Sequence, residues 1–332
     1  GVLSTARINE LVLPAAQACE QVEVLAIASR ELARAERYAA QHGIERSYGS
    51  YASLLEDRDV DAVYIPLPNA LHIEWSERAL EAGKHVLCEK PLARRRQQAE
   101  QAFDIAERVG LVLAEAFMYR HHPQTLQVKS LLGAGAIGAL RLIRASQSFT
   151  ITQAGDVRYS RALEGGALMD VGCYCVNLAR FVAGEPERVY GEQRRGDDGI
   201  DLLFSGTMRF AEDVLAQFDA GIDVPTRDFL ELVGSDGTMD VHDPWMSGSA
   251  EPLISIRRDG ETEHLATEPV DAYRRQLEDF AAAISGEREP RLGRADATAQ
   301  AAAIEALYAS ADSGRPVDLG EPGRPGKEPA RR

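Results

Sequence analysis

The sequence contains little cysteine and no long apolar segment. Its four cysteines in 332 residues form no C-x-x-C pair, which excludes a disulfide framework and favours a reduced, cytoplasmic protein. No uncharged apolar run approaches the roughly 18 residues that a membrane helix needs, so we expect no membrane span. No basic segment followed by an apolar one opens the chain, so we expect no export signal.

Positive charge is also scarce. The chain has 52 Asp and Glu residues against 37 Lys and Arg residues, a formal net charge of −15. This excess argues against nucleic acid or an anionic membrane as the main partner. Only four of the 37 basic residues are lysines, which leaves 33 arginines. Gly1-Val2-Leu3 is typical of the second half of a buried strand, so we expect that a few residues preceding Gly1 are missing.

The motifs of several enzyme classes are absent. His121-His122 has no H-E-x-x-H spacing, and no other His, Asp or Glu cluster has metal-ligand spacing, so no metal is expected. No G-x-S-x-G elbow surrounds a serine. Cys173 and Cys175 stand two apart on a predicted helix and face different ways, so we expect both to be buried rather than to share a metal.

The first 120 residues alternate apolar runs with amphipathic segments at the spacing of βαβ units. The apolar runs are continuous, which indicates a sheet covered on both faces and therefore a doubly wound parallel α/β domain over residues 1–120. The strands are expected at Val22–Ala28, Val60–Ile65, Lys84–Cys88 and Leu111–Ala116, and the helices at Arg30–His42, Ala70–Ala82 and Arg94–Val109.

The pattern changes after about Arg120. Alternating segments then predict an α+β domain over residues 121–317 with an open, mainly antiparallel sheet, one face packed and the other free for a partner. A homodimer or higher homo-oligomer is the default expectation. Residues 318–332, rich in Gly, Pro, Arg and Glu, predict a flexible tail. The strands are expected at Leu140–Phe149, Ile200–Phe210, Val214–Ile222 and Phe229–Val233, and the helices at Pro123–Leu132, Gly166–Val182, Ala272–Ser285 and Ala295–Asp312.

The turn after the first strand is a candidate phosphate site. It is Ser4-Thr5-Ala6-Arg7-Ile8-Asn9, which is no G-x-G-x-x-G match. Small residues still allow the backbone to approach a pyrophosphate at the helix N-terminus, and the Ser4 and Thr5 hydroxyls can donate to it. A plain capped helix explains this turn equally well.

The end of the second strand favours NADP over NAD. An acidic residue takes the ribose 2′-hydroxyl in NAD sites, but here the strand ends in Ser29-Arg30, with Arg34 one turn later. A hydroxyl and guanidinium groups suit a 2′-phosphate, because arginine offers a bidentate fork to phosphate oxygens. The alternative is that Ser29 caps the helix and Arg30 is a solvated surface residue.

Two further polar turns follow strands of the same domain. One contains Leu67, Pro68, Asn69 and His72, and the other is Glu89-Lys90-Pro91. Prolines make such loops rigid, as a binding edge requires, so we assign these residues to cofactor binding. Lys90 stands out because this chain almost always uses arginine, and a retained lysine suggests a need for a compact ammonium.

Asp170 and Tyr174 lie one turn apart in an apolar helix that follows Gly165-Gly166. The glycines allow another backbone or a ligand to come close. A carboxylate in such a helix costs free energy unless it is partnered, which favours a functional interpretation. The alternative is that Asp170 offsets the helix dipole and Tyr174 belongs to the core.

Together these motifs resemble the glucose–fructose oxidoreductase / inositol dehydrogenase (Gfo/Idh/MocA) family. The resemblance extends to about Val317, and its most specific parts are Val86–Leu92 and Gly165–Tyr174. Tyrosine at 174, where many members have histidine, is similar to the dihydrodiol dehydrogenase and glucose–fructose oxidoreductase branch, as is Met118-Tyr119-Arg120-x-x-Pro123. The resemblance implies a Rossmann domain followed by a domain with an open antiparallel sheet.

The resemblance also implies catalytic roles for Lys90, Asp170 and Tyr174. Lys90 would lie by the nicotinamide, Asp170 would hold the substrate, and Tyr174 would be the acid/base. A free tyrosine titrates near ~10, and a nearby ammonium lowers that pKa by favouring the phenolate. We therefore expect an NADP-dependent oxidoreductase acting on a sugar, a sugar derivative or a cyclic diol.

Two other functions fit the same resemblance. One is a ketoreductase for a nucleotide-linked deoxysugar. The other is a dinucleotide-sensing regulator without catalysis, which would have no use for Lys90, Asp170 and Tyr174. We expect the loops around Gln147–Arg161 and Asp243–Gly248 to set substrate specificity.

Overall fold

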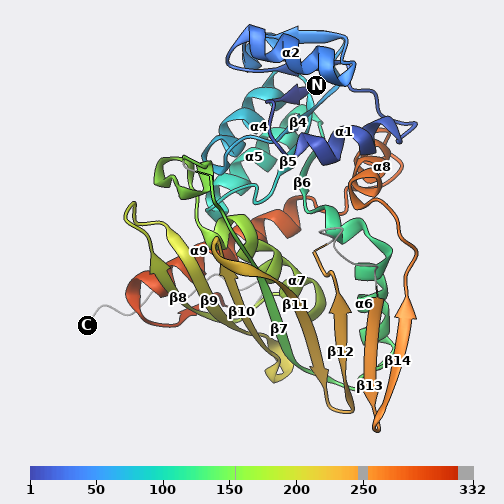
Figure 1. Ribbon diagram of the computed structural model, residues 1–332, viewed down its shortest axis with the longest axis vertical. Coiled ribbons are helices and arrows are strands. Elements are labelled where there is room, and N and C mark those ends of the chain that lie inside the picture. The colour runs from blue at the N-terminus through green and yellow to red at the C-terminus, as the bar shows by residue number, and fades with distance from the viewer. Residues whose placement is uncertain (154, 246–252, 321–332) are drawn as a thin grey trace. The chain divides into compact units, whose positions relative to one another are not determined.

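The computed structural model describes residues 1–153, 155–245 and 253–320 (Figure 1). The chain divides into two compact units. Unit 1 contains Gly1–Pro123, Ala162–Glu164 and Val270–Ala301, whereas unit 2 contains Gln124–Arg161, Gly165–Pro269 and the residues from Ala302 onward. Val270–Ala301, which the sequence assigns to the second domain, therefore groups with unit 1.

Unit 1 is built on a six-stranded sheet with the order β3-β2-β1-β4-β5-β6. All of its paired strands are parallel, which confirms the predicted doubly wound sheet. The strands are β1 (Val2–Leu3), β2 (Ala26–Ala28), β3 (Arg46–Tyr48), β4 (Ala62–Ile65), β5 (His85–Glu89) and β6 (Leu113–Ala116).

Helices cover both faces of this sheet. Successive strand residues point to opposite faces, so Val63 and Ile65 join the core with α3, α4 and α5, whereas Tyr64 joins the core with α1, α2 and α8. Alanines on α4 and α5 let these helices approach the strands closely. The helices are α1 (Asn9–Gln17), α2 (Leu32–His42), α3 (Tyr51–Leu55), α4 (His72–Glu81), α5 (Arg96–Val109) and α8 (Ala272–Ile284), with short 3₁₀ turns η1 (Asn69–Leu71) and η2 (Met118–His121).

The second strand is shorter than predicted. The apolar run Val22–Ala28 contributes only Ala26–Ala28, because β1 and β3 each pair with these three residues or fewer. Strand β3 was not predicted, because its Arg46–Tyr48 sequence carries no apolar run. Strand length in this sheet is therefore set by the neighbours rather than by local hydrophobicity.

Unit 2 is built on a nine-stranded sheet with the order β14-β13-β12-β11-β7-β10-β9-β8-β15. β7 and β10 are parallel and every other pair is antiparallel, which confirms a mainly antiparallel sheet. The strands are β7 (Leu140–Thr150), β8 (Arg188–Arg195), β9 (Asp201–Arg209), β10 (Leu215–Gly221), β11 (Asp223–Gly234), β12 (Gly237–His242), β13 (Leu253–Arg258), β14 (Glu261–Ala266) and β15 (Val317–Asp318).

One face of the unit 2 sheet packs against helices. Phe204 of β9 stacks on Phe218 of β10 and meets Tyr308 of α9 edge-on. Cys173 and Cys175 are buried in α7, as predicted. The helical segments are α6 (Pro123–Gly133), η5 (Leu168–Gly172), α7 (Cys173–Ala183) and α9 (Arg294–Ser313), whose last residues from Ala302 belong to this unit, with 3₁₀ turns η3 (Val157–Tyr159) and η6 (Ala211–Asp213). The 3₁₀ turn η4 (Arg161–Leu163) belongs to unit 1 except for Arg161.

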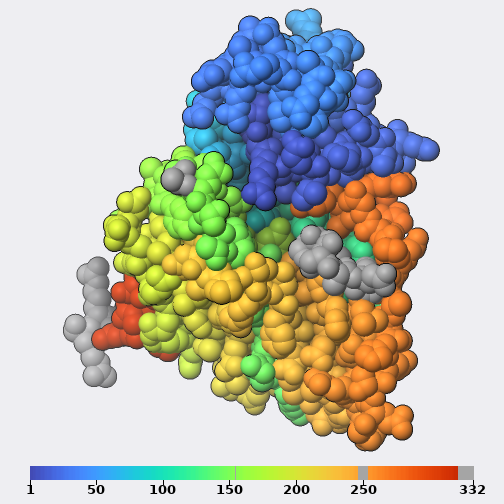
Figure 2. Space-filling view, viewed as in Figure 1, coloured from blue at the N-terminus to red at the C-terminus, as the bar shows by residue number. Residues whose placement is uncertain are grey.

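The opposite face of this sheet is exposed. Figure 2 shows the side chains of its strands, yellow to orange, forming a surface of unit 2. Ion pairs cross the strands there, among them Arg144–Glu231 at 3.2 Å and Arg257–Asp240 at 2.7 Å. Phe229 is 37% exposed on the same face.

The segment Arg161–Ala183 has the length and apolar composition to cross a membrane, with a mean hydropathy of 1.2. However, 83% of the most apolar 18-residue stretch of this segment is buried within the protein, as in the core helix of a globular domain. The tail expected over 318–332 begins inside a strand, because Asp318 pairs with Arg188 of β8. Residues 321–332 lie outside the described residues.

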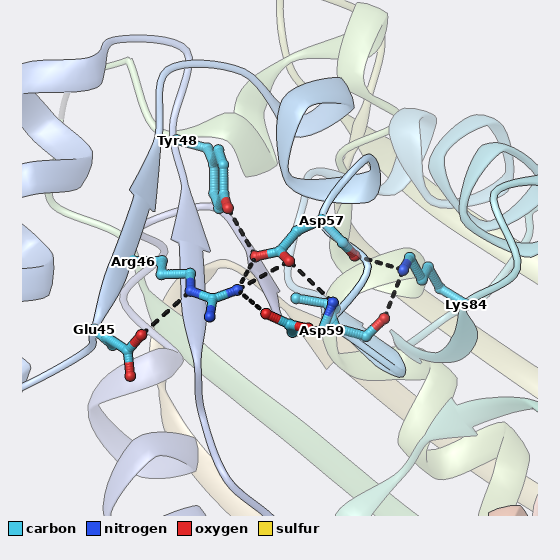
Figure 3. Close-up of polar contacts among 7 residues, drawn as sticks. Glu45, Arg46, Tyr48, Asp57, Asp59 and Lys84 are labelled. Atoms are coloured by element: carbon cyan, nitrogen blue, oxygen red, sulfur yellow. Dashed lines mark hydrogen bonds and ion pairs between the residues drawn. The ribbon is translucent and has the colours of Figure 1, made fainter.

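A cluster of polar side chains around Asp57 lies beside β3 in unit 1 (Figure 3). The Asp57 carboxylate accepts hydrogen bonds from the Tyr48 hydroxyl at 2.7 Å and from Arg46 Nη1 at 2.9 Å. The Lys84 ammonium donates to the carbonyl oxygens of Asp57 at 2.7 Å and Val60 at 2.6 Å. The Tyr48 and Arg46 hydrogen bonds lower the pKa of Asp57 from 3.8 to about 2.

We predict that Asp57→Asn lowers the thermal midpoint at pH 7. The folded-state pKa of Asp57 lies below its unfolded value, so its stabilising effect is complete above the unfolded pKa of 3.8 and is lost as the pH falls toward 2. The difference in midpoint between the wild type and the variant should therefore shrink over that range. Thermal unfolding at pH 7, 4 and 2.5 measures it, and a constant difference would contradict the assignment. Asp198→Asn, in an exposed loop, is the control.

Candidate active site

The carboxyl ends of β2, β1, β4 and β5 lie side by side at one edge of the unit 1 sheet, because these neighbours are parallel. Each of these strands is followed by a candidate residue. Ser4 comes directly after β1, Ser29 after β2 and Lys90 after β5. Leu67 follows β4 after one intervening residue. Ligands bind at this edge in open parallel sheets, where the strand order reverses. The fold thus gathers the segments that the sequence analysis assigned to a cofactor.

The turn after β1 is tied to β4 and to its own helix. The Ser4 hydroxyl donates to the Pro66 carbonyl at 3.1 Å, and Asn9 Nδ2 donates to the Ser4 carbonyl at 2.8 Å. The first turn of helix closes with the Asn9 N–H on Ala6 O at 3.1 Å, so the amides of Thr5–Ile8 stand at a helix N-terminus. Such amides favour an anion. Asn9, the last residue of the predicted turn, thus holds Ser4 through its buried amide.

Positive charge gathers beside this turn. Arg34 Nη2 donates to the Thr5 carbonyl at 3.5 Å. Burial raises the pKa of the Tyr51 hydroxyl, whereas Arg30 and Arg34 act in the opposite direction, so both guanidinium charges lie near this phenol. Ser29 is buried and its hydroxyl accepts from the Glu31 N–H at 3.5 Å, while Glu31 itself stands at the N-cap of α2.

His72 joins two loops at the same edge. Its ring nitrogens Nδ1 and Nε2 lie 2.9 Å from the Pro91 carbonyl oxygen and 2.7 Å from the Leu67 carbonyl oxygen. The ring is buried, and burial lowers its pKa. His72 therefore faces backbone on both sides and holds the Leu67-Pro68 loop against the loop that follows Lys90.

Glu89, Lys90 and Asn69 are half-buried at this edge. Glu89 Oε1 accepts from the Tyr64 hydroxyl at 2.6 Å, and its Oε2 accepts from the Lys90 N–H at 3.4 Å. Asn69 Nδ2 donates to the Glu164 carbonyl at 2.9 Å, within unit 1. The carboxylate of Glu89 thus orients the backbone that presents Lys90.

In unit 2, Asp170 lies in a π-helical turn, Leu168–Gly172, that leads directly into α7. Such turns occur frequently at functional sites. Tyr174, one turn later, is 7% exposed and packs edge-on against Trp245, with ring centroids 6.0 Å apart. Trp245 Nε1 donates to the Ser146 carbonyl at 3.0 Å, which holds the indole in place. Asp170 and Tyr174 are therefore presented by one continuous helical segment.

The paired glycines before this turn allow two close contacts. An added Cβ on Gly165 would lie 2.2 Å from the Arg158 carbonyl oxygen. One on Gly166, whose φ is +121°, would lie 2.1 Å from Asp201 Oδ1. The buried Asp201 carboxylate accepts from the Leu168 N–H at 2.6 Å and from the Tyr308 hydroxyl at 2.9 Å. Gly165 thus leaves room for the Arg158 carbonyl, and Gly166 leaves room for the Asp201 carboxylate.

Three residues of unit 2 escaped the sequence analysis: Arg158, Asp201 and Trp245. Arg158 Nε donates to Asp170 Oδ2 at 2.7 Å. Arg158 and Trp245 fall in the two loops expected to set specificity, but a single arginine gives no signal in a chain with 33 of them. Residues 154 and 246–248 of these loops lie outside the described residues.

Family models match both parts of the chain. Residues 2–117 match an oxidoreductase family with an NAD-binding Rossmann fold, and residues 125–240 match the GFO/IDH/MocA C-terminal domain.

Individual proteins are similar over most of the chain. D-xylose 1-dehydrogenase (NADP(+)) 2 of Haloferax volcanii is 39% identical over 96% of this chain and 99% of its own. The 3-ketoreductase KijD10 of Actinomadura kijaniata, solved with NADP and TDP-benzene, has a TM-score of 0.89 and 37% identity, over 93% of this chain and 96% of its own. Trans-1,2-dihydrobenzene-1,2-diol dehydrogenase of Danio rerio is 35% identical over 67% of each chain.

Proposed function

The chain belongs to the GFO/IDH/MocA family of oxidoreductases, and we propose that it transfers a hydride between NADP and a carbinol or carbonyl carbon of a sugar, a sugar derivative or a cyclic diol. The observation that carries this proposal is the presentation of Asp170 and Tyr174 by one helical segment, in a chain whose Rossmann sheet carries Lys90 at its ligand-binding edge. A regulator without catalysis would not need these three groups.

The residues at the unit 1 edge fit a phosphorylated dinucleotide. The amides of Thr5–Ile8 would hold the pyrophosphate at the α1 N-terminus. Ser29, Arg30 and Arg34 would hold the 2′-phosphate, and the contact between Arg34 and Thr5 O supports this grouping. Bound NADP would supply the hydride acceptor or donor. Leu67, Pro68, Asn69, His72 and Glu89 would shape the nicotinamide end.

The three remaining groups handle the substrate. Tyr174 exchanges a proton with the reacting oxygen, because the loss of hydride from a carbinol carbon requires a base on its oxygen. Lys90, directly after β5, would lie by the nicotinamide. Asp170 accepts a hydrogen bond from a substrate hydroxyl. Its Oδ2 also accepts from Arg158 Nε at 2.7 Å, which fixes the direction of the carboxylate.

We predict that Tyr174→Phe lowers kcat by about 10²–10⁴-fold while NADPH binding persists, because only the proton exchange is lost. Steady-state rates and fluorescence titration of NADPH measure the two effects. Tyr38→Phe, which removes a hydroxyl that donates to Glu10 on the surface, is the matched control and should retain wild-type turnover. Unchanged turnover in Tyr174→Phe would remove this residue from the reaction.

We predict that NADPH binds at least about 10-fold more tightly than NADH, since a charge-assisted contact to a phosphate contributes about 1.5–3 kcal/mol. Arg30→Ala and Arg34→Ala should each weaken NADPH binding and leave NADH binding unchanged. Arg37→Ala, exposed on the same helix α2, is the control. Equal Kd values for the two cofactors in the wild type would refute the 2′-phosphate assignment.

A nucleotide-linked ketosugar is the second candidate substrate, favoured by the similarity to KijD10 over most of both chains. A substrate panel separates the candidates. It contains free pentoses and hexoses, cyclic vicinal diols and nucleotide-linked ketosugars, each tested with NADP⁺ or NADPH. Turnover confined to nucleotide-linked ketosugars would replace the main proposal by this second one.

We also propose that the exposed face of the unit 2 sheet forms a homodimer interface. Phe229 and Leu215, 37% and 44% exposed, offer apolar contacts there among paired charges. Light scattering should give about twice the 36.2 kDa chain mass, and Phe229→Glu should shift it toward one chain by burying an unpaired charge. A monomeric wild type at micromolar concentration would refute the interface.

A further inference from the structure

We propose that Arg158 is the residue that positions Asp170 for the substrate, and that it belongs to the reaction's machinery although it does not touch the reacting atoms. The inference rests on the proposed function, in which Asp170 accepts a hydroxyl of the substrate. It concerns contacts within unit 2 only.

The side chains of Arg158 and Asp170 are in direct contact. Arg158 Nε donates to Asp170 Oδ2 at 2.7 Å, the short length of a charge-assisted hydrogen bond. Asp170 is 15% exposed and Arg158 is 40% exposed, so water screens this pair less than a surface pair. The Asp170 charge is also the largest cause that raises the pKa of Arg158. The guanidinium therefore holds one carboxylate oxygen in a set direction.

The Arg158 side chain is itself held in place by its neighbours. Its Nη1 lies 3.3 Å from both carboxylate oxygens of Asp156. Asp156 Oδ1 also accepts from the Arg158 backbone N–H at 2.9 Å and so caps the 3₁₀ turn η3. The guanidinium carbon lies 5.8 Å from the centre of the Phe149 ring on β7. Because these groups hold Arg158, it transmits a defined geometry to Asp170.

The backbone of Arg158 also contacts the segment that carries Asp170. The Arg158 carbonyl accepts the Gly166 N–H at 2.9 Å, and a side chain at Gly165 would collide with that carbonyl. The same residue therefore contacts the segment before Asp170 through its main chain and Asp170 itself through its side chain. An arginine that served surface charge alone would not require both contacts.

Arg188 provides a matched comparison in the same unit. Its Nε also donates to an aspartate oxygen at 2.7 Å, that of Asp318, but both side chains are largely exposed, at 56% and 72%. Exposed pairs of this kind contribute little. Arg188→Gln thus removes the same chemical contact without affecting Asp170, and it should leave activity at the wild-type level.

The test is a double-mutant cycle between Arg158→Gln and Asp170→Asn, read as kcat and KM on the best substrate of the panel. Arg158→Gln should lower kcat/KM by about 10–30-fold, since charged residues in direct contact are energetically coupled. In the Asp170→Asn background the same substitution should change kcat/KM by less than about 3-fold. Arg158→Lys should have a kcat/KM between those of Arg158→Gln and the wild type. The lysine ammonium keeps the positive charge but cannot bind Asp170 and Asp156 together, as the guanidinium does.

The outcomes separate the failure of this inference from that of the proposed function. Equal losses from Arg158→Gln in both backgrounds, or full activity in Arg158→Gln, would overturn the inference while Asp170 keeps its role. An Asp170→Asn enzyme with wild-type kinetics would overturn the role of Asp170 and the inference with it. A wild type inactive on the whole panel would overturn the proposed function. NADPH binding and thermal midpoints confirm that each variant folds, and Asp156→Asn, which loosens Arg158 indirectly, should reproduce a smaller loss.

Discussion

The parallel alignment of β2, β1, β4 and β5 is the constraint on which unit 1 depends. A parallel sheet must be covered on both faces, so each strand is followed by a helix and every carboxyl end emerges at one edge. Ser4, Ser29, Leu67 and Lys90, far apart in the chain, thereby come to neighbouring strand ends. His72 then links the loops after β4 and β5 through two backbone carbonyls.

Unit 2 depends on a different constraint, the close approach of chain segments around Gly165 and Gly166. The Arg158 carbonyl and the Asp201 carboxylate occupy the space that side chains at these positions would need. Asp201 satisfies the Leu168 N–H at the start of the π-helical turn, where an unpaired buried donor would be costly. This packing sets where the helix begins, and hence how Asp170 and Tyr174 are presented.

Sequence patterns predicted the elements whose signals are local. Continuous apolar runs located β4, β5 and β6, and alternation located β7, β9, β10 and β11. Two of the strands that were not predicted have no such signal: β3 is the polar Arg46–Tyr48, and β14 has five exposed residues of six. They form because a neighbouring strand offers backbone hydrogen bonds, which no single segment reveals. Likewise, α9 divides between the units at Ala301 without any change in its own pattern.

The sequence by itself determined the class of sheet in each unit and the identity of Lys90, Asp170 and Tyr174 as candidates, because rare residue types and short motifs are visible along the chain. Only the tertiary structure decided which groups hold them. Arg158 reaches Asp170 across 12 residues, Arg34 reaches Thr5 across 29, and Tyr308 reaches Asp201 across 107. Such contacts depend on the packing of whole elements, and an arginine among 33 others acquires its role only from where the fold places its guanidinium.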